Sequence, residues 1–145
     1  MKQIIGCLLV ASTLVAGGCS TSADDASSTL PSAPSSPLVT DNFSGTVQVG
    51  SSDFHTFTVT SSGFPITVTV TSAGPPATIS MGIGVGTVLG GTCQVASGTS
   101  ASTIAPASST PQLSGTITSG QYCLLIADVG NQSGPITYTA VILHY

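Results

Sequence analysis

The sequence predicts an all-β fold, an antiparallel sandwich of two sheets with seven or eight strands and one disulfide bond. Three observations lead to this prediction. From residue 41 onward, apolar and polar residues alternate with a period of two, no segment has the 3.6-residue apolar repeat of a helix, and turns rich in Gly and Ser separate the alternating segments. Short strands at this spacing are typical of a sandwich.

Residues 1–18 are typical of a bacterial lipoprotein signal peptide. Lys2 supplies a minimal charged start, and residues 4–16 form an apolar stretch too short to span a bilayer as a helix. The stretch Val-Ala-Gly-Gly-Cys that ends at Cys19 resembles a lipobox, which implies that the Cys19 thiol is lipidated and becomes the first residue of the mature chain. Ser20 favours sorting to the outer membrane if the cell has two membranes. The alternative is ordinary secretory cleavage that leaves Cys19 free.

Residues 19–40 are predicted to be a disordered tether between this anchor and a single domain at 41–145. The segment consists mainly of Ser, Ala, Thr and Pro, so it has too little apolar area to offset the entropy of ordering. At about 3 Å per residue it would hold the domain up to ~60 Å from the membrane.

Within residues 41–145 the alternation defines the expected strands. They lie at residues 43–49, 55–60, 66–71, 78–85, 113–117, 120–128 and 135–143. Residues 97–110 lack a packing signal and are predicted to be a long surface loop. The glycines at alternate positions in 82–86 predict a bulge or a close neighbour on one face of that strand.

The segment 120–128 is the longest apolar run after the signal peptide and is predicted to be a central strand, buried on both faces. Tyr122, Leu124 and Ile126 should fill the interior. The last strand is also apolar and is expected to lie inside a sheet rather than at its edge.

The chain resembles the bacterial pre-peptidase C-terminal domain, a jelly-roll sandwich found in exported proteins. The resemblance implies a non-catalytic accessory domain with the same fold. It rests on Phe-Ser-Gly-Thr at 43–46, Gly50, Asp53 and Phe57-Thr-Val, Ile-Thr-Val-Thr-Val at 66–70, Gly-Gln-Tyr-Cys at 120–123, and Ile-Thr-Tyr-Thr-Ala at 136–140.

Two cysteines, Cys93 and Cys123, remain after the signal peptide and Cys19 are set aside. A pair of cysteines in an exported protein predicts a disulfide bond. It would close a loop of about 30 residues and contribute on the order of 3.5 kcal/mol.

Charge excludes nucleic acid as a partner. The chain has one basic residue, Lys2, and the mature part would have none to neutralise phosphates. We expect no cofactor and no metal. Asp41, Asp53 and Asp128 are weak calcium candidates, because a calcium site usually needs several carboxylates and these are isolated.

The sequence therefore predicts a non-catalytic, lipid-anchored cell-surface protein with a binding or structural role toward an unidentified protein or glycan. The main alternative is a carbohydrate- or calcium-binding module, with Phe54, Phe64 and Tyr145 as candidate exposed rings.

An uncharacterised hydrolase is less favoured, because no serine lies in a Gly-x-Ser-x-Gly motif. His144 is also one residue from the C-terminus, where we expect a general base to be poorly held. Thr67, Thr69 and Thr71 have the spacing of the Thr ladders of ice-binding proteins, which gives ice binding as a further hypothesis, although Thr is also common in strands.

Overall fold

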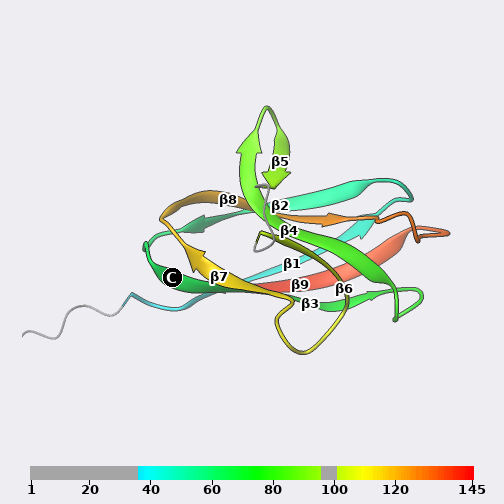
Figure 1. The fold of residues 1–145 in the computed structure, drawn as a ribbon, viewed down its shortest axis with the longest axis horizontal. Helices are drawn as coiled ribbons and strands as arrows, with labels where there is room; N and C mark the ends of the chain where they lie inside the picture. Colours follow the sequence, from blue (N-terminus) through cyan, green and yellow to red (C-terminus); the bar gives the residue numbers. More distant parts are fainter. Residues whose placement is uncertain (1–35, 96–100) are drawn as a thin grey trace, which may run out of the picture. The chain divides into compact units, whose positions relative to one another are not determined.

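The computed structural model describes residues 36–95 and 101–145. All of the described residues belong to one compact unit, Pro34–Tyr145. These residues form nine β-strands and no helix (Figure 1). The strands are β1 (Val39–Val47), β2 (Ser52–Val59), β3 (Phe64–Gly74), β4 (Ser80–Leu89), β5 (Thr92–Val95), β6 (Ser102–Pro106), β7 (Leu113–Ile117), β8 (Gly120–Ala127) and β9 (Ile136–His144). The predicted all-β class is confirmed.

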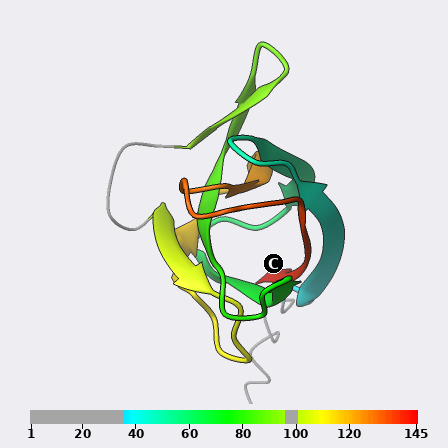
Figure 2. The ribbon, with the colours of Figure 1, turned by 90° about the vertical axis from the view of Figure 1, so that its right-hand side faces the viewer.

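The strands form two antiparallel sheets that face each other (Figures 1 and 2). One sheet has the order β1-β9-β3-β7, and the other has the order β2-β8-β4-β5, with β6 also paired to β4. The strands pair from the ends of the domain toward its middle: β1 with β9, β2 with β8, β3 with β7, and β4 with β6. All four pairs are antiparallel, as in one long hairpin rolled into two layers. This is the strand order of a jelly roll, into which β5 is inserted between β4 and β6.

The core lies between the sheets, where the strands of the sandwich other than β5 turn alternate side chains inward. Val68, Met81, Leu124, Ile126 and Ile142 are all at most 1% exposed. The sequence alternation identified this face because hydrophobic side chains gain free energy when they leave water, and the period of a strand is two. The last strand, β9, lies between β1 and β3, so the prediction that it is internal is confirmed.

β8 is central in its sheet, between β2 and β4, as predicted. The prediction that β8 is buried on both faces is right for only some of its residues. Cys123 on the outer face and Leu124 on the inner face are both fully buried, but Leu125 is partly exposed and so is Tyr122. The outer face is covered only where the disulfide crosses it.

The predicted surface loop at 97–110 is wrong for Ser102–Pro106, which form β6 and pair with β4. Backbone hydrogen bonds hold β6 more than side-chain burial does, and Ile104 points outward with 66% of its surface exposed. A strand held in this way leaves little apolar signal in the sequence. The short strand β5 was not expected either.

Of the two alternatives that the glycine spacing in β4 left open, the close neighbour is the one the structure shows. A Cβ atom on Gly84 would lie 2.7 Å from Cγ2 of Val95, and one on Gly86 would overlap the carbonyl group of Gln94. A Cβ atom on Gly82 would lie 3.3 Å from Val129. The missing side chains therefore let β5 and the loop after β8 lie against β4.

Candidate functional site

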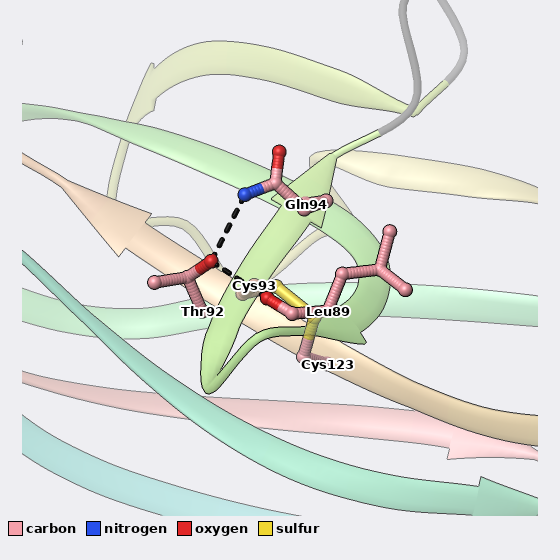
Figure 3. The surroundings of a disulfide bond; sticks show 5 residues. All are labelled: Leu89, Thr92, Cys93, Gln94 and Cys123. Carbon is pink, nitrogen blue, oxygen red and sulfur yellow. Dashed lines mark hydrogen bonds between the residues drawn. A yellow bond between two sulfur atoms is a disulfide. The ribbon is translucent and has the colours of Figure 1, made fainter.

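The predicted disulfide is present, with an S–S distance of 2.02 Å between Cys93 on β5 and Cys123 on β8 (Figure 3). It joins the β4–β5 hairpin to the outer face of the five-stranded sheet. Figures 1 and 2 show this hairpin extending away from both sheets. Its turn is Gly90-Gly91, both with positive φ, and Thr92 donates a 2.9 Å hydrogen bond to the Leu89 carbonyl group.

A groove of about 720 Å³ opens at the side of the sandwich where β7 faces β4 and β5. Its lining is mainly aliphatic, and Tyr122 is its aromatic member. Hydroxyl and amide side chains from Thr87 and Gln94 also contribute. The remaining lining residues are Ile66, Val68, Val85, Gly86, Val95, Ala101, Leu113, Ser114, Gly115, Thr116 and Ile117. None of these lining residues is charged, so the groove suits an uncharged ligand.

The disulfide shapes this groove. Cys93 lies directly before Gln94 and Val95, which form part of the groove wall. Since β5 is only four residues long and pairs with the end of β4, the bond to β8 is its main covalent constraint. The covalent bond therefore fixes one wall of the groove.

An aromatic pair lies beside the groove. The rings of Phe64 and Tyr145 are stacked, with centroids 4.8 Å apart, and Phe64 is 38% exposed. Phe64 pairs across strands with Ile117, which lines the groove. Phe54, the third candidate ring, is partly exposed on β2 in the other sheet.

A polar cluster of Asp53, His55 and Tyr138 joins the edge strand β2 to β9. Tyr138 Oη donates to Asp53 Oδ2 at 2.9 Å and lies 2.9 Å from His55 Nε2. Because the hydroxyl hydrogen is used on Asp53, the Tyr138 oxygen accepts from His55, which assigns the proton to Nε2. The ring of Phe43 stacks on His55. Burial, followed by the bond to Asp53, raises the pKa of Tyr138 well above its ordinary value.

The second histidine is held in a similar way. His144 is 1% exposed, and its Nε2 donates to Asp41 Oδ2 at 2.9 Å. Its Nδ1 has no hydrogen-bond partner among the described residues. The expectation that His144 is poorly held near the C-terminus is therefore wrong, because β9 continues to this residue inside the sheet.

Both histidines thus point into the sandwich and are bonded to Asp41 or to Tyr138. Their partners include no serine, cysteine or threonine, so neither histidine has a nucleophile to activate at hydrogen-bond distance. Inward-pointing polar groups on the edge strands β1 and β2 instead fit a role against edge-to-edge pairing with other chains.

The three calcium candidates have separate hydrogen-bond partners. Asp41 bonds His144, and Asp53 bonds Tyr138. Asp128 accepts from the backbone amide of Gly50 at 2.7 Å and from those of Gly130 and Asn131, which lowers its pKa. No group of three or more His, Cys, Asp or Glu side chains in residues 36–95 and 101–145 is placed to hold a metal ion.

The lipidation candidate Cys19 lies outside the described residues.

The groove was not predicted from the sequence, because it forms between strands that are far apart in the chain. The polar clusters had a usable signal: Asp41, Asp53, His55 and His144 all occupy positions that the alternation assigns to the inner face.

Compared with protein-family models, curated proteins and solved structures, the chain matches none of them. In the part of the chain that the structure describes, no helix is long and apolar enough to cross a membrane.

Proposed function

We propose that this protein is an exported, lipid-anchored, non-catalytic binding module that holds an uncharged ligand in the groove between β7 and the β4–β5 hairpin. The observation that carries the proposal is the groove itself. It has a volume of about 720 Å³, an aliphatic lining with hydroxyl and amide groups, and no charged residue in that lining. Sites for small ligands are typically concave and mostly apolar, with a few polar groups that orient the ligand.

Two further observations support a binding role rather than a catalytic one. His55 and His144 are bonded inside the sandwich, away from the groove lining. The resemblance to the pre-peptidase C-terminal domain also suggests an accessory module. A lipid on Cys19 would place such a module at the outer membrane, or at the single membrane of a cell that has only one.

A neutral glycan is the ligand class that one specific observation favours. The stacked rings of Phe64 and Tyr145 form a partly exposed aromatic surface beside Ile117 at the groove. Sugar rings present apolar C–H faces that pack on aromatic rings, while their hydroxyl groups can bond side chains such as Gln94 and Thr87.

The groove is tested by filling it. Gly115 lines it, and a Cβ atom at Gly115 would meet nothing within 4 Å. Gly115→Trp therefore places a large ring in the groove without a clash at its base. Gly134→Trp is the matched control, because Gly134 also has open space and does not line the groove. Binding to a neutral-glycan array should be lost in Gly115→Trp and kept in Gly134→Trp.

Phe64→Ala separates the glycan proposal from the groove in general. Loss of the glycan signal in Phe64→Ala supports stacking on the aromatic pair, whereas an unchanged signal rejects it. Hydrolysis of generic esters or peptides that His55→Ala abolishes would show that the protein is an enzyme and contradict the non-catalytic proposal.

The anchor is tested separately. Cells that express the chain should incorporate labelled palmitate into it, and Cys19→Ala should remove the label. Continued labelling of Cys19→Ala would refute the predicted anchor.

A further inference from the structure

The β4–β5 hairpin carries two linked side-chain hydrogen bonds that end at the groove. Gln94 Nε2 donates to Thr92 Oγ1 at 2.9 Å, and Thr92 Oγ1 donates to the carbonyl oxygen of Leu89 at 2.9 Å (Figure 3). Gln94 is one of the residues that line the groove, whereas Thr92 is not. Thr92 therefore acts on the groove through Gln94.

These two bonds fix which way round the carboxamide of Gln94 lies. The hydroxyl hydrogen of Thr92 is used on the Leu89 carbonyl group, so the Thr92 oxygen can only accept a hydrogen bond. Only the Nε2 end of the carboxamide has hydrogens to donate, which assigns Nε2 to Thr92. The Oε1 atom consequently points away from Thr92, as Figure 3 shows. Gln94 thus offers a ligand an oriented hydrogen-bond acceptor.

The hairpin backbone holds this arrangement in place. Gly90 and Gly91 both have positive φ, as a tight two-residue turn requires, so the chain returns directly to Thr92. The next residue, Cys93, is bonded to Cys123 on the opposite face of the strand. A side chain that is already held loses less conformational entropy when a ligand binds it.

Thr87 places a hydroxyl group beside this acceptor. It is the cross-strand partner of Gln94 in the β4:β5 pair, and both residues line the groove. Directly opposed residues of antiparallel strands have their Cβ atoms about 5 Å apart on the same face of the sheet. An oriented amide oxygen and a rotatable hydroxyl group therefore lie next to each other.

We propose that Gln94 and Thr87 recognise two adjacent hydroxyl groups of the uncharged ligand, and that Thr92 is the positioning residue that orients Gln94. One ligand hydroxyl group donates to Gln94 Oε1, and its neighbour bonds the hydroxyl group of Thr87. The proposal rests on the proposed function, because it uses the same groove. It adds the chemistry of the ligand, which is a vicinal diol on a saturated ring.

The other wall of the groove fits such a ring. Leu113 and Ile117 of β7 line the groove with aliphatic side chains. A saturated ring with hydroxyl groups on one edge matches both walls, since its C–H bonds can face β7 while its hydroxyl groups face the hairpin. A fully apolar ligand would take the Gln94 carboxamide out of water without giving it a partner.

The test uses two small probes, trans-1,2-cyclohexanediol and trans-1,2-dimethoxycyclohexane. Both carry adjacent oxygens on a six-membered ring, but only the diol can donate hydrogen bonds. Chemical-shift titration of the ¹⁵N-labelled full chain carrying Cys19→Ser measures each affinity at the groove. The diol should bind about tenfold more tightly than the dimethoxy probe, because ether oxygens leave Gln94 Oε1 without a donor. Gly115→Trp should abolish the shifts caused by either probe.

Variants of Thr92 test its positioning role. Thr92→Val keeps the shape of the side chain and removes the hydroxyl group, so affinity for the diol should fall about three- to tenfold, as expected for one neutral hydrogen bond. Affinity for the dimethoxy probe should not change. Thr92→Ser keeps a hydroxyl group and should retain the affinity of the parent. Thr58→Val is the matched control, because Thr58 is exposed on β2 and does not line the groove.

A measurement without any ligand tests the orientation of Gln94 itself. Relaxation of the ¹⁵N nucleus in its side-chain amide should show restricted motion in the parent and in Thr92→Ser, and faster motion of larger amplitude in Thr92→Val. A merely structural role of Thr92 would change the unfolding midpoint and leave the motion of Gln94 and the preference for the diol unaltered.

Three results would each overturn the proposal. Equal affinity for the two probes would show that the groove binds rings without reading hydroxyl groups, and the proposed function would stand. Parent-like affinity for the diol in Thr92→Val, or a freely rotating Gln94 amide in the parent, would remove Thr92 from its role. Failure of the diol to bind would refute the hydroxyl-recognising pair, while the glycan array with Gly115→Trp decides the proposed function separately.

Discussion

The hydroxyl group of Tyr138 on β9 donates a 2.9 Å hydrogen bond to Asp53 on β2, and this bond joins the two sheets. Tyr138 is only 2% exposed, and because burial disfavours the charged phenolate, the pKa of its phenol is raised in the folded protein. The raised pKa is consequently a property of the folded state and is lost on unfolding.

This relationship predicts a loss of stability at high pH. The unfolded phenol ionises from about pH 10, while the folded phenol stays neutral, so the contribution of Tyr138 is complete below its unfolded pKa of 10.0 and is lost as pH rises above it. The free energy of unfolding should fall by up to about 1.4 kcal/mol per pH unit in that range. Urea titrations between neutral and alkaline pH would measure it.

Tyr138→Phe should remove this alkaline slope. At neutral pH it should also cost about 1–3 kcal/mol, because Asp53 loses its donor. Tyr122→Phe is the control, since the hydroxyl group it removes makes an exposed hydrogen bond to Thr118. An equally steep alkaline slope in Tyr138→Phe would contradict this account.

Asp128 predicts the opposite pH dependence. Its pKa is lowered, first by the Gly50 amide and then by those of Gly130, Asn131 and Gln132. Its stabilising contribution is therefore present above the unfolded pKa of 3.8 and is lost as pH falls below it. Asp128→Asn should be less stable than the parent at neutral pH, and the difference should shrink below about pH 4. A difference that grows on acidification would refute the assignment.

The disulfide should stabilise the fold by closing a long loop. Cys93 and Cys123 are 30 residues apart, for which chain entropy gives about 3.5 kcal/mol. The double variant Cys93→Ala/Cys123→Ala should lose stability of this order in thermal or urea unfolding. Its affinity for any groove ligand should also fall, since Gln94 and Val95 lose their anchor. Non-reducing mass spectrometry that finds free thiols at Cys93 and Cys123 would contradict the bond.

Gly86 should not tolerate a side chain. A Cβ atom there overlaps the backbone of Gln94, so Gly86→Ala must displace β5 and should cost about 1–3 kcal/mol. Gly115→Ala is the matched control on another strand, because its Cβ atom meets nothing within 4 Å. Thermal unfolding of the two variants provides the comparison, and equal midpoints would show that β5 does not cross Gly86 closely.

The last strand should be essential for folding. Ile142 is fully buried, whereas its neighbour Leu143 is partly exposed on the outer face. Ile142→Ala should cost about 2–5 kcal/mol, and Leu143→Ala should cost less. Deletion of residues 142–145 should abolish folding, because β9 lies between β1 and β3. Circular dichroism and urea unfolding measure both effects. A folded deletion variant would contradict the topology.

Residue patterns along the chain were enough to predict an all-β sandwich, the central position of β8 and β9, and the disulfide between Cys93 and Cys123. Burial of one face imposes a period of two, continuous apolar runs mark strands inside a sheet, and the two cysteines left after the N-terminal segment predict a bond. The glycine spacing at 82–86 likewise predicted a bulge or a close neighbour, although it did not identify Val95 or Gln94 as that neighbour.

Tertiary structure decided the rest. The strand order that pairs β1 with β9 brings Asp41 to His144 and Asp53 to Tyr138, pairs that lie 103 and 85 residues apart. The groove also forms only when distant strands pair, and β6 is held mainly by backbone bonds to β4. No local pattern encodes such contacts, because pairing between distant strands depends on the whole fold rather than on neighbouring residues.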